Sequence, residues 1–211
     1  MEDFEILVAK LANDAVTVSP APHPYLLALK LITAAAIYLV LSLAISGLRP
    51  DLAQALQQPW FVAEIIALLL TFIVTSFSAA LLAFPDLYQK RGLAFAPLWM
   101  FAMFLLVMLF AWHADSPPAP LPAHSYQCTI CITLLAMLPA MWTFYTLRKY
   151  ASTHYHWAGS IVLISAFSVG ALWLRLHEVN DSITHVIEWH YLPMFAAGIL
   201  GLWLGTIILR W

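Results

Sequence analysis

Eight side chains with imidazole, thiol or carboxylate groups lie in two short segments, at 128–131 and 177–190, and seven of them are candidates for one site. These groups bind soft or borderline metal ions in proteins. Three of them are spaced i, i+4, i+8, so they would share one face if their segment is helical; they are His177, Asp181 and His185. The candidate metal- or redox-sensing residues are therefore Cys128, Cys131, His177, Glu178, Asp181, His185 and His190.

The two cysteines form one CxxC pair, Cys128 and Cys131. A single pair is a weak indication of zinc, which usually takes two such pairs or added histidines. The alternative is that the polar side chains are simply solvated in short loops, while the cysteines act as small hydrophobic residues. Both interpretations stay open, because the ligands come from loops of unknown proximity.

Two further charges, Glu64 and Arg175, each lie about one turn inside an apolar run. An ionisable group inside a membrane span indicates function by default. Both lie near the same interface, where they could pair or extend to water. We expect a structural ion pair in preference to a proton path, since no series of carboxylates follows the spans.

The elements that must position these groups are membrane helices. The chain is 63% hydrophobic and 9% charged, whereas soluble domains are about 45–50% apolar and about 25% charged. Six runs have the roughly 20 apolar residues that cross a bilayer: 25–46, 61–84, 93–112, 127–146, 157–176 and 191–209. The predicted fold is an all-α polytopic membrane protein with a six-transmembrane-helix bundle. The acidic first residues argue against a cleavable signal peptide.

Basic residues predict the orientation of the spans, because Lys and Arg concentrate in short cytoplasmic loops. Only Arg49 and Arg175 fall on the side opposite the termini. The others fall on the side of the termini: Lys10, Lys30, Lys90, Arg91, Arg148, Lys149 and Arg210. Both termini are therefore predicted to be cytoplasmic, and the metal-ligating candidates face the other side.

Several function classes lack support. The chain has no GxSxG, HExxH or phosphate-binding glycine loop, so we expect no enzyme. It has no basic face for direct nucleic acid binding. Gly201 and Gly205 form a GxxxG pair that lets helices approach closely. We favour packing inside the bundle for this pair, with a homo-oligomer contact as the alternative.

The N-terminal segment differs from the rest. Residues 3–13 predict a short amphipathic helix, with Phe4, Leu7 and Leu11 on one face and Val8 beside them. Such a short helix is marginal in water, and a groove on a partner would order it. The alternative, a helix resting on lipid, is disfavoured because it has few basic residues. The predicted organisation is an N-terminal segment 1–18, a proline-rich linker 19–24 and a membrane domain 25–211.

Several motifs together resemble a known family. They are Leu7-Val-Ala-Lys-Leu-Ala-Asn-Asp14 before the linker, Leu48-Arg-Pro-Asp-Leu52 after the first span, Pro59-Trp-Phe-Val-Ala-Glu64, Cys128, and Leu176-His177 through Asp181-Ser182, His185 and Trp189-His190. The chain is similar, almost end to end, to the NrsF-type bacterial inner-membrane anti-sigma factors.

The resemblance implies a six-span protein of the bacterial inner membrane that holds an extracytoplasmic-function (ECF) sigma factor inactive. It implies that the cytoplasmic N-terminus makes the sigma-factor contact, here Phe4, Leu7, Val8, Leu11, Asp14 and Val16. In the family, two outward-facing cysteines are implicated in a response to metal or oxidative stress. Cys128 matches one of them, whereas the place of the other is Glu178.

This departure leaves two arrangements open. Cys131 substitutes for the second cysteine, or the site is a metal site of Cys, His and Glu. A different hypothesis is a membrane enzyme or a metal or haem protein. It would use the periplasmic cluster, with His177, Asp181 and His185 as ligands. The only cofactor suggested is a divalent metal at the periplasmic face.

Overall fold

The computed structural model describes residues 2–13, 21–86, 90–114 and 126–210, and the regular elements within these ranges are all helical. Six of the helices are long and apolar enough to span a membrane. They confirm the predicted spans: α2 (Pro24–Ser46), α4 (Pro59–Leu82), α5 (Arg91–Ala114), α6 (Tyr126–Leu147), α7 (Tyr155–His177) and the helical run Ile183–Ile208, which ends in α9 (Leu192–Ile208).

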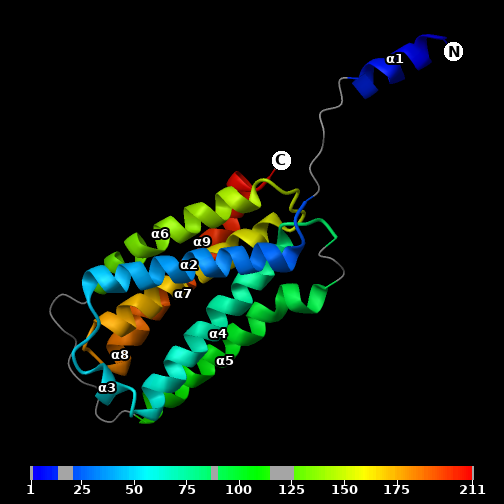
Figure 1. The fold of residues 1–211 in the computed structure, drawn as a ribbon. Coiled ribbons are helices and arrows are strands. Elements are labelled where there is room, and N and C mark those ends of the chain that lie inside the picture. The colour runs from blue at the N-terminus through cyan, green and yellow to red at the C-terminus, as the bar shows by residue number, and fades with distance from the viewer. Residues whose placement is uncertain (1, 14–20, 87–89, 115–125, 211) are drawn as a thin grey trace.

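The six helices run up and down in one bundle (Figure 1). We call the end where α2 begins and α9 ends the proximal end, and the opposite end the distal end. Proline stands in the first turn of α2, α4 and α9, where its missing N–H costs no hydrogen bond. Helix α2 ends at Gly47, whose φ of 86° is a conformation that side chains with a Cβ rarely adopt.

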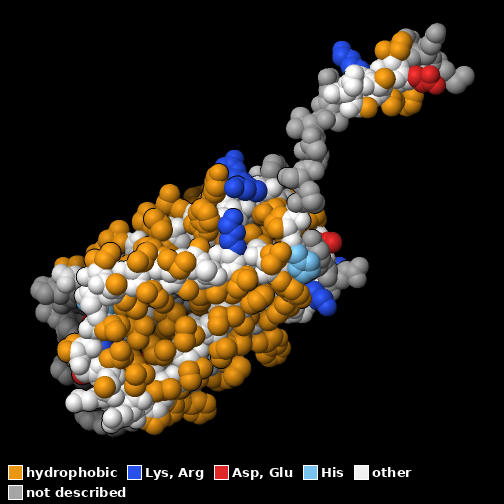
Figure 2. Space-filling model, in the orientation of Figure 1, with side chains coloured by type: hydrophobic (Ala, Val, Ile, Leu, Met, Phe, Trp, Pro, Cys, Tyr) orange, Lys and Arg blue, Asp and Glu red, His pale blue; other side chains and the backbone are white. Residues whose placement is uncertain are grey.

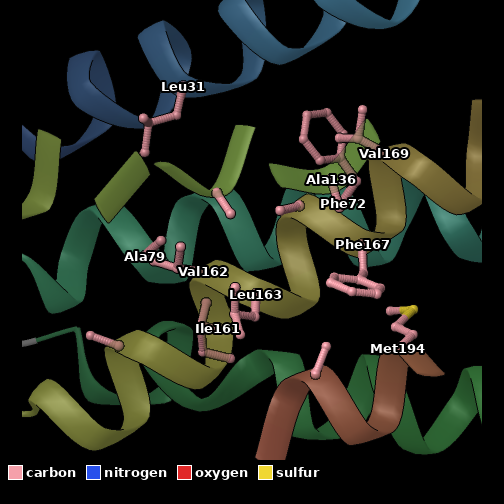
Figure 3. Close-up of a cluster of buried hydrophobic side chains, with 14 of the residues drawn as sticks. Leu31, Phe72, Ala79, Ala136, Ile161, Val162, Leu163, Phe167, Val169 and Met194 are labelled. Carbon is pink, nitrogen blue, oxygen red and sulfur yellow. The ribbon is translucent and has the colours of Figure 1, made fainter. Parts of the chain in front are cut away.

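Helix α7 is the centre of the bundle and packs against α2, α4, α6 and α9. Figure 3 shows its side chains among neighbours from the surrounding helices, such as Phe72, Ala136 and Met194. The outer helices instead expose much apolar surface, which covers the flank of the molecule in Figure 2. An apolar exterior around a buried central helix is what a lipid environment requires.

Helices α7 and α9 approach closely through glycines. A Cβ added to Gly159 would overlap the carbonyl oxygen of Gly201, and one added to Gly205 would overlap the carbonyl oxygen of Tyr155. The GxxxG pair therefore serves packing within the chain, which is the role favoured for it from the sequence.

The N-terminal helix is present as α1 (Glu2–Asn13) and is set apart from the bundle (Figure 1). Its apolar residues Phe4, Leu7, Val8 and Leu11 are exposed. Asp14 and Val16 lie outside the described residues. Helix α2 begins at Pro24, the last residue of the predicted linker.

Candidate functional site

Four metal-ligating side chains converge at the distal end. They come from the first turn of α6, from the residue after α7, from the short helix α8 (Ile183–Val186), and from the π-helical turn η2 (Ile187–Tyr191). One ligand atom from each lies within 4.8 Å of the ligand atoms of all the others. We call this group the donor cluster; its members are Cys128, Glu178, His185 and His190.

The carboxylate of Glu178 is the centre of the donor cluster. Its Oε1 lies 3.4 Å and its Oε2 3.5 Å from Sγ of Cys128. Nε2 of His185 lies 3.5 Å from Oε1, and Nε2 of His190 lies 3.4 Å from Oε2. Both imidazoles are fully buried and meet edge to face, whereas the thiol and the carboxylate are only half-buried. The cluster is therefore open to the distal surface through Cys128 and Glu178.

The π-helical turn explains how the two histidines meet. His185 and His190 are five residues apart, which in an α-helix would place them about 140° apart around the axis. A π-helix closes i→i+5 hydrogen bonds, so residues five apart come close to one face. The N–H of Leu192 donates to the carbonyl of Ile187 in this pattern. Thr129 Oγ1 also donates to the carbonyl of Trp189 at 2.7 Å, which attaches η2 to α6.

The electrostatics of Glu178 depend on its two histidine neighbours. Burial alone would raise the pKa of this carboxyl, but interaction with His190 and His185 holds its pKa below the ordinary value. Glu178 is thus ready to bind a cation as a carboxylate. Nδ1 of His190 is buried and has no hydrogen-bond partner in the part of the chain that the structure describes.

A second polar group, the arginine network, lies beside the donor cluster. Its members are Arg49, Asp51, Glu64, Arg175, Asp181 and Tyr191. The guanidinium of Arg49 is 2% exposed and holds two carboxylates at once. It donates to both oxygens of Asp51 at 2.8 Å, and to the two oxygens of Asp181 at 2.8 and 2.7 Å. Such bidentate pairs fix orientation as well as charge.

The second arginine extends this network into the bundle. Arg175 Nε lies 2.8 Å from Oε1 of Glu64, and Nη2 donates to Asp181 at 3.1 Å. The hydroxyl of Tyr191 donates to Glu64 Oε1, and the ring of Phe61 lies under both guanidinium groups. The Glu64–Arg175 contact considered from the sequence is thus present, and it belongs to a larger network.

The charges of the network stabilise one another. Hydrogen bonds to Asp181 and Asp51 raise the pKa of Arg49. Burial alone would raise the pKa of Asp181, but the two arginines hold it below its ordinary value. The hydrogen bonds from Arg49 likewise lower the pKa of Asp51. Asp51 precedes the short helix α3 (Leu52–Ala55), but its side chain does not cap that helix because Arg49 holds it.

The condition under which His177, Asp181 and His185 would share one face, a helical segment, is not met. Helix α7 ends at His177 and residues 178–182 are not helical, so the i, i+4, i+8 spacing does not align these side chains. His177 stacks on Trp173, and its Nδ1 lies 2.9 Å from the carbonyl oxygen of Gly47. Asp181 binds arginines, and only His185 enters the donor cluster.

Cys131 is exposed and is not a member of the donor cluster, although it is one turn from Cys128. Arg49, Asp51 and Tyr191 were not among the candidate site residues. The Leu48-Arg-Pro-Asp-Leu52 motif could have indicated the first two, since an Arg and an Asp two residues apart can pair locally. Nothing in the sequence linked Arg49 to Asp181, which is 132 residues away.

Comparison with known proteins identifies the family. A family model described as negative regulator of sigma F, NrsF, matches residues 11–211. Searches of curated proteins and of solved structures gave no match. The matched range includes all six spans, the donor cluster and the arginine network, whereas most of α1 precedes it. Because the match covers nearly the whole chain, the protein belongs to the NrsF family of negative regulators of a sigma factor.

Proposed function

We propose that this protein is a membrane-bound anti-sigma factor that holds an ECF sigma factor at the cytoplasmic face of the bacterial inner membrane. In this proposal α1 and the residues after it, up to residue 18, bind the sigma factor. A signal at the distal, periplasmic end releases it. The observation that carries the proposal is the separation of an exposed apolar helix from a polar cluster at the opposite end of the bundle.

The surface of α1 supports a binding role. Phe4, Leu7 and Leu11 are all more than half exposed. Burying a Leu or Phe side chain fully is worth about 1.5–3 kcal/mol. A groove on the sigma factor that covered these three residues would therefore supply much of the binding free energy of a stable complex, in the helix-in-groove mode.

The distribution of basic residues supports the proposed orientation. Figure 2 shows Lys and Arg side chains gathered near the proximal end and on α1. The two basic residues at the distal end, Arg49 and Arg175, are buried against carboxylates. Free positive charge thus concentrates at the proximal end, as the cytoplasmic side of a membrane protein requires.

The central helix offers a physical connection between the two ends. Helix α7 carries Arg175 and leads directly to Glu178 at the distal end, and it packs against four other spans along its length. A signal that favours one packing arrangement of these helices would change the population that binds the sigma factor. Changing a ratio from 1:99 to 99:1 requires about 5.5 kcal/mol of differential binding.

The test is recovery of the cognate ECF sigma factor with the purified full-length protein. We expect the deletion of residues 1–18, and the triple variant Phe4→Ala/Leu7→Ala/Leu11→Ala, to lose the sigma factor. The matched control, Lys10→Ala/Asn13→Ala, changes polar residues of the same helix and should retain it. Equal recovery with the triple variant and the intact chain would contradict the proposal.

The alternative hypothesis, a membrane enzyme or metal carrier, is not supported by the ligand set that the sequence suggested for it. His177, Asp181 and His185 lie apart and serve different contacts. The donor cluster that does form is equally suited to the sensing end of a regulator, which the family match favours.

A further inference from the structure

The donor cluster has the composition of a metal site. It offers one thiol sulfur, one carboxylate oxygen and two imidazole nitrogens. Mixed S, N and O ligands suit borderline divalent d-block cations of the Zn²⁺ type, whereas Ca²⁺ and Mg²⁺ prefer oxygen alone. Four such ligands satisfy the tetrahedral coordination of zinc without a water molecule.

The distances agree with that coordination. A tetrahedron with Zn–S of about 2.3 Å and Zn–N or Zn–O of about 2.0–2.1 Å has ligand–ligand edges of about 3.3–3.5 Å. The ligand atoms of Cys128, His185 and His190 each lie 3.4–3.5 Å from an oxygen of Glu178, with His185 at Oε1 and His190 at Oε2. The other pairs lie within 4.8 Å, so small side-chain rotations would close the tetrahedron.

The backbone around the cluster is arranged for these ligands. The π-helical turn η2 brings His185 and His190 together, and π-helical turns occur frequently at functional sites. Two completely buried imidazoles beside a carboxylate are costly to bury unless their nitrogens are satisfied. Neither nitrogen of His190 has a hydrogen-bond partner among the described residues, and Nε2 faces the carboxylate of Glu178 at 3.4 Å. Unsatisfied buried groups in native structures commonly point to an ion or water.

The arginine network holds the site in place. Asp181 lies three residues after Glu178 and is bound by both Arg49 and Arg175. Tyr191 follows His190 directly and donates to Glu64. Each segment that supplies a ligand from the α7–α9 connection is thus fixed by a neighbouring ion pair or hydrogen bond. Fixed supporting contacts of this kind raise metal affinity.

We propose that Cys128, Glu178, His185 and His190 bind one divalent d-block cation of the Zn²⁺, Co²⁺ or Cd²⁺ type. The cation joins the distal ends of α6, α7 and α9. The claim that this cation is the signal that releases the sigma factor rests on the proposed function. The claim that the four residues bind a cation is independent of any sigma factor, so the two claims can fail separately.

The test is Co²⁺ titration of the full-length protein in detergent, without a sigma factor. A cysteine ligand gives a thiolate-to-cobalt charge-transfer band, and a tetrahedral site gives strong visible absorption. We expect one Co²⁺ per chain, displaced by Zn²⁺. Cys128→Ser should abolish the charge-transfer band. His190→Ala should weaken binding by at least about tenfold, because even loss of an outer-shell partner costs about 10- to 100-fold.

Two control variants sharpen the result. Cys131→Ser changes the other cysteine of the CxxC pair, and His177→Ala changes the neighbouring histidine; both should leave the Co²⁺ spectrum and affinity unchanged. Absence of stoichiometric Co²⁺ binding would overturn the proposal. Loss of the charge-transfer band in Cys131→Ser, with retention in Cys128→Ser, would overturn it equally.

A gain-of-affinity variant covers the case in which a ligand variant fails to fold. Glu178→Cys replaces the oxygen ligand by a second thiolate, which favours softer cations. We expect this variant to shift the preference from Zn²⁺ toward Cd²⁺ and to strengthen the charge-transfer band. An unchanged Cd²⁺/Zn²⁺ preference in the folded variant would show that residue 178 does not bind the metal.

Discussion

The two ends of the molecule are organised in opposite ways. At the distal end, charged and metal-ligating side chains are buried, and each of the two arginines there holds two carboxylates. At the proximal end, α1 stands apart from the bundle with its apolar side chains exposed. A rigid polar end suits the detection of a small ligand, whereas an exposed amphipathic helix needs a protein partner to bury it. The contrast predicts that substitutions at the distal end change stability, while those in α1 change binding.

The largest loss of stability is expected for Arg175→Ala. This change leaves Glu64 buried without its cation, which typically costs about 3–5 kcal/mol. Equilibrium unfolding in mixed detergent micelles measures the difference. The exposed Arg148 at the proximal end provides the control, because Arg148→Ala should change stability by less than about 0.5 kcal/mol. Equal losses in both variants would remove the contrast between the two ends.

A smaller loss is expected where α7 and α9 touch. Gly159→Ala forces the two backbones apart, and such overpacking typically costs about 1–3 kcal/mol. Gly92 in α5 has open space around its Cα, so Gly92→Ala should be neutral or slightly stabilising. The same unfolding assay compares the two. Normal stability in the Gly159 variant would show that the close approach is not needed.

The pH dependence of stability should depend on Asp181. The pKa of this carboxyl is lowered in the folded state, so its contribution is present above the ordinary pKa of about 3.9. That contribution is lost as pH falls through the lower folded-state pKa. Unfolding curves measured from neutral pH into this acid range should show a smaller decline in Asp181→Asn than in the unaltered chain. Parallel declines would contradict this assignment.

The smallest effect on stability is expected for the apolar face of α1. Phe4→Ala, Leu7→Ala and Leu11→Ala remove side chains that are exposed, so each should change the unfolding free energy by less than about 0.5 kcal/mol. The same variants should weaken sigma-factor recovery. A marked loss of stability would indicate that α1 packs on the bundle.

Sequence patterns predicted the membrane architecture well because long apolar runs have one low-energy arrangement in lipid. The second span is an example, predicted at 61–84 and found at Pro59–Leu82. Helix boundaries within polar segments were harder to predict. The segment 178–182 satisfies a helical spacing, but Glu178 and Asp181 point to different partners and the chain is irregular there.

The sequence predicted which residues form the donor cluster, but it did not predict how they are arranged. Cys128, Glu178, His185 and His190 were all among the candidates, together with three residues that lie elsewhere. The five-residue spacing of the two histidines matches no α-helical face, so only the π-helical turn reveals that they meet. The arginine network depends on contacts between residues more than 100 positions apart, which local patterns do not encode.

The proposed function requires that the two ends lie on opposite faces of the membrane. The most direct measurement is labelling of single cysteines with a membrane-impermeant thiol reagent, in chains that also carry Cys128→Ser and Cys131→Ser. Val179→Cys at the distal end and Lys10→Cys in α1 both replace exposed side chains. We predict that Val179→Cys is labelled in intact spheroplasts, and that Lys10→Cys is labelled only after they are permeabilised. Labelling of Lys10→Cys in intact spheroplasts would place α1 outside the cytoplasm and contradict its role in binding a sigma factor.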